Sequence, residues 1–239
     1  MRIFIVALLL AILTSVASAQ SPLARRAFEK GAEAARAGRF EDALTAYMTA
    51  AAAERAAESG SGFRISLQYN IGVCYYRLGR QEEARAALTA AIRLSDGRHQ
   101  RAFYALGMAE SSLRNWPAAR AAFRASLELA PKEGEAWFDL AIVYIGEEKY
   151  DLAAHAFTAS IENRSVDSAL GQNNLGVLMA MRSDYDAAEK AFAAALELSA
   201  GKLIEARNNL ILCRRMRQSG RQLIADTRFA FATRDRRSG

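Results

Sequence analysis

Histidine, cysteine and proline are scarce in this sequence, and each shortage excludes something. Two histidines, His99 and His155, are too far apart in the chain to predict a metal site or a catalytic pair. Two cysteines, Cys74 and Cys213, are too few for a disulfide framework. The sequence also lacks a glycine-rich phosphate loop and a Gly-x-Ser-x-Gly elbow. We therefore expect no enzymatic activity, no cofactor and no bound metal.

The rest of the composition is typical of a helical protein. Only three prolines interrupt a chain in which 51% of residues are hydrophobic, and alanine, arginine and glutamate dominate the rest. These are strong helix formers, so we expect a folded, largely helical chain.

The first nineteen residues have the pattern of a secretory signal. A positive charge at Arg2 is followed by an apolar run from Ile3 to Leu13 and by small residues that end at Ala19. We predict that residues 1–19 are a signal peptide and that the mature chain is exported, periplasmic or secreted. The alternative is that the segment is kept as an anchor, because the apolar run extends to Val16.

Charge is distributed unevenly along the chain. Gln20 to Lys202 has 22 basic and 23 acidic residues, whereas Leu203 to Gly239 has nine basic and three acidic ones. A polyanionic or membrane-surface partner is therefore expected at the C-terminal end of the chain.

The main signal is a repeat of about 34 residues. One half of each unit reads "NIGVCYYRLG", "ALGMAESSLR", "DLAIVYIGEE" or "NLGVLMAMRS". The other half reads "FEDALTAYMTAA", "QEEARAALTAAI", "WPAARAAFRASL", "YDLAAHAFTASI" or "YDAAEKAFAAAL", in which a large apolar residue follows an alanine by four and a small residue follows three later. Each half has helical periodicity, so each unit is predicted to be a helix-turn-helix.

This pattern resembles the tetratricopeptide repeat, whose units read W-x2-L-G-x2-Y, A-x3-F and P. The fourth unit supplies Trp137, Leu140, Tyr144, Ala153 and Phe157. The resemblance implies an all-α fold, a right-handed α-solenoid of five such repeats plus a C-terminal capping helix. The small eighth residue of each unit should let its two helices approach closely. These residues are Gly31, Gly72, Gly107, Ala141 and Gly176.

We place the repeats at 24–57, 65–98, 100–133, 134–167 and 169–202. An insert at 58–64 is expected to break the helix through Gly60 and Gly62. The capping helix is expected at 203–218, because Asn208-Asn209-Leu210 repeats Asn173-Asn174-Leu175 and arginines take the place of apolar residues. Residues 219–239 match no repeat and are predicted to be a basic tail, disordered or folded only conditionally.

The cysteines are four repeat steps apart, at the tenth place of their helices. With neighbouring helices roughly 8 to 10 Å apart, they should lie on the order of 30 Å from one another. A disulfide tolerates a Cα separation of only about 4.4 to 6.8 Å, so we expect two buried free thiols.

The resemblance also implies a concave groove lined by the first helix of each unit. Apolar residues at the fifth and ninth places and asparagines at the sixth place are expected to bind a protein or peptide partner. The predicted groove residues are Tyr69, Asn70, Val73, Tyr104, Met108, Phe138, Ile142, Asn174 and Val177. The fifth-place aromatics could instead pack between successive helices, and the asparagines could satisfy local helix groups.

These features predict a non-enzymatic scaffold in the cell envelope that binds an apolar or amphipathic partner segment. The alternative is that the basic tail binds anionic lipid or envelope polysaccharide, with no role for nucleic acid in an exported protein. A third hypothesis is that the tail lies in its own groove or in that of a second copy, because Leu223, Ile224, Phe229 and Phe231 are apolar.

Overall fold

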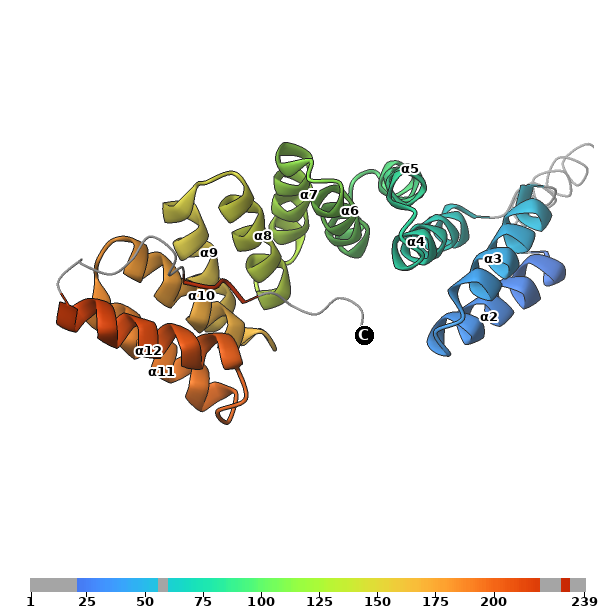
Figure 1. Cartoon of the computed structure of the whole chain (residues 1–239). Coiled ribbons are helices and arrows are strands. Elements are labelled where there is room, and N and C mark those ends of the chain that lie inside the picture. Colours follow the sequence, from blue (N-terminus) through green and yellow to red (C-terminus); the bar gives the residue numbers. More distant parts are fainter. Residues whose placement is uncertain (1–20, 56–59, 220–228, 233–239) are drawn as a thin grey trace, which may run out of the picture. The chain divides into compact units, whose positions relative to one another are not determined.

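The computed structural model describes residues 21–55, 60–219 and 229–232, and within them it contains eleven helices and no strand. The prediction of an all-α helical repeat fold is confirmed. The predicted signal peptide and most of the predicted basic tail lie outside the described residues. The helices, labelled in Figure 1, are α2 (Pro22–Arg36), α3 (Phe40–Arg55), α4 (Ser61–Arg77), α5 (Gln81–Leu94), α6 (Gln100–Ser112), α7 (Trp116–Leu129), α8 (Gly134–Gly146), α9 (Tyr150–Glu162), α10 (Ser168–Met181), α11 (Tyr185–Leu198) and α12 (Ile204–Ser219).

Several helix starts are encoded locally. The Ser21 hydroxyl accepts a hydrogen bond from the amide of Ala24 at the start of α2, and the Asp184 carboxylate accepts one from the amide of Ala187 at the start of α11. His99 caps α6 in the same way, with its Nδ1 accepting from the amide of Ala102 at 3.0 Å. Acidic residues occupy the first turns of α3, α5, α9 and α11, where the helix dipole favours negative charge.

Helix α4 begins within the predicted insert 58–64, at Ser61. Gly60 is the N-cap residue of α4, but Gly62, expected to break the helix, lies in the first turn of that helix. Glycine costs little there because the first amide groups of a helix have no intrahelical partner in any case. A methyl group on Gly62 would meet no atom within 4 Å, so the residue serves no close approach.

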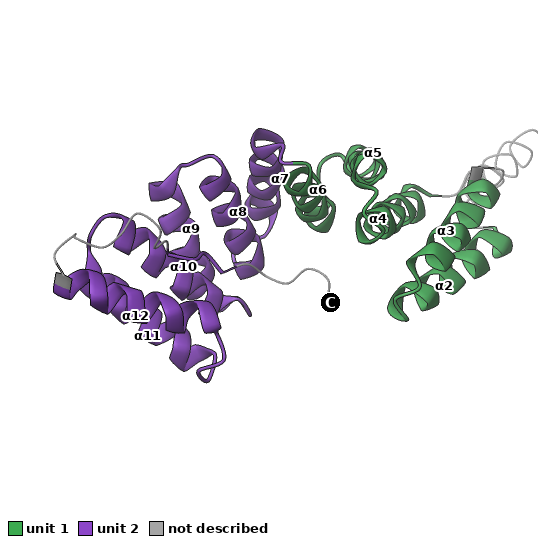
Figure 2. Ribbon diagram, viewed as in Figure 1, with its two compact units in different colours: residues 1–113 green, residues 114–239 purple. Residues whose placement is uncertain are grey.

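The chain divides into two compact units, residues 1–113 and 114–239, coloured separately in Figure 2. In the first unit, α2 packs against α3, α4 against α3 and α5, and α5 against α6. In the second, each helix from α7 to α12 packs against the next, and α10 also contacts α12. Each unit buries its own apolar clusters, around Tyr47 and Leu88 in the first and around Phe157 and Phe192 in the second.

The core of each unit is built from the repeat positions themselves. The large residue of each second helix is at most 1% exposed, namely Tyr47, Leu88, Phe123, Phe157 and Phe192. The alanine four residues before each of them is 0% exposed. Burying such a side chain stabilises the fold by about 1.5–3 kcal/mol relative to leaving it in water. The period seen in the sequence is therefore the period of the core.

The eighth-place glycines permit close helix approach, as predicted, in three repeats. A Cβ atom added to Gly31 would lie 2.8 Å from the Tyr47 ring, one on Gly72 would lie 2.6 Å from Leu88 Cγ, and one on Gly176 would lie 2.7 Å from Phe192 Cε1. Non-bonded carbon atoms in contact normally lie about 3.5–4 Å apart. A side chain at these places would therefore push the two helices of the repeat away from each other.

In each repeat, the turn between the two helices contains a residue with a left-handed backbone conformation (positive φ), and it stands at the same position of every repeat. Glycine occupies it in the first two repeats, Gly38 at φ 73° and Gly79 at φ 76°. Arg114, Glu148 and Ser183 occupy it in the other three, at φ between 56° and 64°. A side chain in this conformation costs roughly 1–2 kcal/mol.

Glycine at position 148 should therefore stabilise the protein. We expect Glu148→Gly to raise the free energy of unfolding by about 0.5–1 kcal/mol, the strain released being partly offset by the greater freedom of glycine in the unfolded chain. The matched control is Gly79→Ala, which should lower it by about 1 kcal/mol. Urea denaturation measures both, and equal effects of the two substitutions would contradict this account of the turn.

Candidate site for an extended segment

Three asparagine side chains form a connected buried row on the first helices of the last repeat and the cap. Asn173 and Asn174 lie on α10 and are 0% exposed, and Asn209 lies on α12 and is 2% exposed. The side-chain amide nitrogen of Asn209 donates to Oδ1 of Asn173 at 2.9 Å, and the side-chain amide nitrogen of Asn173 donates to Oδ1 of Asn174 at 3.1 Å. We call these three residues the asparagine site.

The asparagine site holds a segment of the C-terminal tail, residues 229–232. The backbone amide of Ala230 donates to Oδ1 of Asn209 at 2.9 Å, and the Ala230 carbonyl accepts from the Asn209 amide at 2.8 Å. The backbone amide of Ala232 donates to Oδ1 of Asn174 at 2.6 Å, and the Ala232 carbonyl accepts from the side-chain amide of Asn174 at 2.8 Å. The Asn173 amide also donates to the Ala230 carbonyl at 3.1 Å. Two asparagines thus pair with alternate residues of the segment, as a neighbouring β-strand would.

The side chains of the segment add apolar contacts. The ring of Phe229 stacks on Phe192 of α11, with centroids 6.1 Å apart and an angle of 13° between the ring planes. Phe231 packs against two clusters, one around Phe138 and Phe157 and one around Val177 and Phe192. Figure 1 shows the segment, in dark red, running from α10 towards α8 within the second unit. Part of the tail that the sequence predicts to be disordered or conditionally folded therefore lies on the repeats.

The side chain of Asn209 uses both its donor nitrogen and its acceptor oxygen at the site. Its amide nitrogen donates to Asn173 and to the Ala230 carbonyl, and its Oδ1 accepts from the Ala230 amide. A buried amide without partners costs roughly 1–3 kcal/mol, so the backbone of the segment satisfies groups that would otherwise need water. These hydrogen bonds involve only main-chain groups of the segment, so they do not themselves depend on its side chains.

The predicted groove residues of the second unit lie at or beside this segment. Asn174 binds its backbone, and Val177 and Ile142 belong to the clusters against which Phe231 packs. Phe138 is 1% exposed, with its ring 5.5 Å from that of Phe157, so it lies in the core as the packing alternative describes. Asn173 is absent from the predicted set, although its position beside Asn174 in a repeated Asn-Asn-Leu motif is a signal for it.

The predicted groove residues of the first unit contact their own unit. The amide of Asn70 donates to the Ser66 carbonyl on the same helix, which is the local role left open by the sequence. Tyr69 packs its ring 5.0 Å from His99, and burial raises the pKa of its hydroxyl. Val73 on α4 and Tyr104 and Met108 on α6 are half-buried, so part of each side chain is still open to solvent.

The remaining candidates for chemistry are the two cysteines and His155. Cys74 and Cys213 are buried and free, as predicted. Burial raises the pKa of Cys74 to about 11 and also raises the pKa of Cys213, which suppresses the reactive thiolate. His155 is exposed on α9. Over the described part of the chain, no three His, Cys, Asp or Glu residues are grouped so as to hold a metal.

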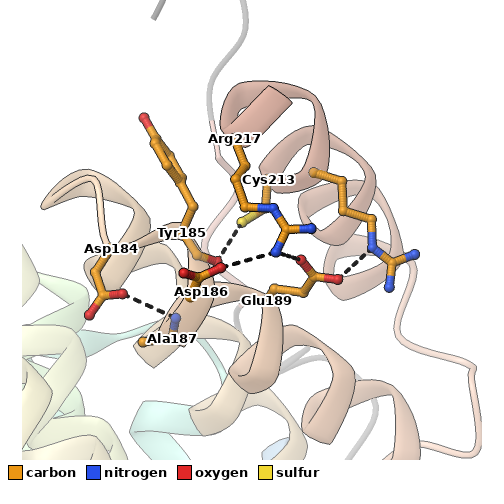
Figure 3. A network of polar contacts seen from close by, with 8 residues as sticks. Asp184, Tyr185, Asp186, Ala187, Glu189, Cys213 and Arg217 are labelled. Carbon is orange, nitrogen blue, oxygen red and sulfur yellow. Dashed lines mark hydrogen bonds and ion pairs between the residues drawn. The ribbon is translucent and has the colours of Figure 1, made fainter. Parts of the chain in front are cut away.

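A polar network fixes the capping helix to the last repeat (Figure 3). Arg217 of α12 pairs with Asp186 and Glu189 of α11 at 3.0 Å each, and Arg214 pairs with Glu189 at 2.7 Å. The Cys213 thiol, beneath them, donates to the Tyr185 carbonyl at 3.2 Å. Exposed ion pairs contribute little singly, but several charges that share partners contribute more, and these join α11 to α12, the helix that carries Asn209.

None of the described helices has the length and apolarity needed to span a bilayer. The basic residues Arg221, Arg228, Arg234, Arg236 and Arg237 lie outside the described residues.

The sequence matches family models of the tetratricopeptide repeat over residues 66–97, 104–147 and 138–202. No curated protein gives a significant match. The fold resembles that of the solved MamA 41-end from Desulfovibrio magneticus RS-1, at a TM-score of 0.68 and 19% identity, covering 77% of this chain and 99% of that one. A tetratricopeptide repeat protein from Parabacteroides merdae matches at a TM-score of 0.67 and 22% identity, with 81% and 74% covered.

A third solved structure, YrrB, is described as a tetratricopeptide repeat protein with an unusual peptide-binding site. It matches at a TM-score of 0.61 and 20% identity, covering 80% of this chain and 90% of that one. The repeats, their buried positions and these matches agree, and the chain belongs to the tetratricopeptide repeat family.

Proposed function

We propose that this protein is a non-enzymatic interaction scaffold that binds an extended, apolar or amphipathic segment of a partner protein. The observation that carries the proposal is the pairing of Asn174 and Asn209 with both the amide and the carbonyl of alternate residues in an extended segment. Such pairing holds a main chain, and the aromatic contacts beside it provide selectivity. The peptide-binding site named for YrrB, a protein of similar fold, supports the same class of function.

We further propose that the scaffold acts in the cell envelope, periplasmic or secreted. The support is the signal-like pattern of residues 1–19, with its single charge, its apolar run and the small residues that end at Ala19. A partner would then be another exported protein or the periplasmic part of a membrane protein.

In-cell photo-crosslinking tests the scaffold function. A photoreactive residue placed at Met108 on α6, or at Ile142 on α8, should form adducts with one recurrent foreign protein, identified by mass spectrometry. The control position is Leu152 on α9, a second helix of its repeat, where the side chain is 46% exposed. Adducts only within the chain itself, or the same adducts at Leu152 as at the two test positions, would contradict the proposal.

A further inference from the structure

The four residues that occupy the asparagine site differ in how far their side chains are enclosed. Phe229 and Phe231 are half-buried against the repeats, and Ala232 is 1% exposed. Ala230 is exposed, although its backbone is held by two asparagines. The site therefore has two aromatic positions, one open position and one position with room only for a small side chain.

The register of the segment follows the repeat. Two residues of extended chain span roughly 7 Å, and neighbouring packed helices are about 8–10 Å apart, so a step of two residues suits a step from one first helix to the next. Ala230 pairs with Asn209 of α12, and Ala232 with Asn174 of α10, each at the sixth place of its repeat. The sixth place of α8, the next first helix, is Asp139, which is 2% exposed. A carboxylate there favours a basic residue two positions after the small one.

From these positions we infer the class of segment that the site recognises. It is an extended chain with the pattern aromatic, any, aromatic, small, followed two positions later by a basic residue. Phe229–Ala232 is the protein's own copy of the first four positions, and a partner segment of the same pattern binds by displacing it. This inference rests on the proposed function and names the chemistry of its partner.

Displacement has a definite cost because the tail is covalently attached. Only residues 220–228 separate α12 from the bound segment, and a short tether gives a local concentration on the order of millimolar. A free segment of equal intrinsic affinity would thus compete poorly with the tail. Loss of the two tail aromatics should free the site without changing any residue of its walls.

A labelled ten-residue peptide with the sequence of residues 226–235, DTRFAFATRD, tests the inference by fluorescence anisotropy. The full chain carrying Phe229→Ser and Phe231→Ser should bind it at least about tenfold more tightly than the unaltered chain does. Circular dichroism and the melting temperature check that both proteins are folded.

Altered peptides, each bound to the double variant, test the pattern itself. Phe231→Ser and Ala232→Leu in the peptide should each weaken binding about tenfold or more, because one removes the aromatic contact and the other overfills an enclosed position. Ala230→Leu, the matched control, should change it less than about twofold, since that side chain faces solvent. Arg234→Glu should weaken it about threefold or more, because the glutamate would approach Asp139.

Three results would overturn the inference. They are equal binding of the Ala230→Leu and Ala232→Leu peptides, equal binding of a scrambled peptide, and no gain from the double variant. Each would leave the scaffold function standing if crosslinking at Met108 and Ile142 still captured a foreign protein. Failure of that crosslinking would count against the scaffold function whatever the peptide results.

Discussion

Asn174→Ala is expected to release residues 229–232 from the repeats and to lower the free energy of unfolding of the C-terminal unit by about 1–3 kcal/mol. Asn174 bonds both backbone groups of Ala232 and also accepts from Asn173, and its side chain is fully buried. Alanine removes these partners and leaves the Asn173 amide with one hydrogen bond fewer. Chemical denaturation gives the change in stability, and peptide binding by the Phe229→Ser, Phe231→Ser chain should fall at least about tenfold when Asn174→Ala is added.

The matched control for this prediction is Asn208→Ala. Asn208 precedes Asn209 on α12, has the same side chain, and is exposed. Its replacement should leave peptide binding and stability unchanged within about 0.5 kcal/mol. If the two alanine variants behaved alike, the asparagine site would have no special part in holding the segment.

Gly176→Ala is expected to destabilise the protein by about 1–2 kcal/mol, against the usual helix preference for alanine. A Cβ atom would lie 2.7 Å from Phe192, whose ring is fully buried, so α10 and α11 would have to separate or the ring would have to turn. Overpacking of this kind costs about 1–3 kcal/mol, partly offset by the propensity gain. Because Phe229 stacks on Phe192, the substitution should also weaken docking of the tail.

Gly62→Ala is the control for that substitution. Gly62 is also on a first helix, but a methyl group there meets no atom within 4 Å. Alanine should stabilise the protein by about 0.5 kcal/mol, through the reduced freedom of the unfolded chain. Guanidinium denaturation compares the two variants, and a stabilising effect of both would show that close approach at Gly176 is not required.

The core was predictable from the sequence because it repeats. Positions such as Ala153 and Phe157 recur in every unit, and their spacing on a helix places them on one buried face. The eighth-place glycines were predictable for the same reason, since a small residue recurs opposite a large one. The expected helix break at Gly62 is wrong, because a glycine's effect depends on its place in the helix, and Gly62 lies in the first turn.

The site was only partly predictable. The recurrence of Asn174 and Asn209 at one repeat position indicates a shared role, but Asn70 at the same position bonds its own helix instead. The aromatic Phe138 has the pattern of a groove residue and lies in the core, because a helix of this family packs on two sides and periodicity does not distinguish them. Phe229 and Phe231 contact repeats that are distant from them in sequence. Local sequence patterns do not determine such a contact, so docking of the tail is only one of several hypotheses that the sequence offers.

Amide hydrogen exchange of Ala230 and Ala232 in the full chain, resolved by NMR, tests the central claim most directly. Both amides donate to asparagine side chains, so their exchange should be slowed at least about 100-fold relative to an unstructured peptide. The protection should disappear in the Asn174→Ala variant at Ala232. Exchange of both amides at the unstructured rate in the unaltered chain would contradict the account, since no extended segment would then be held by the asparagine site.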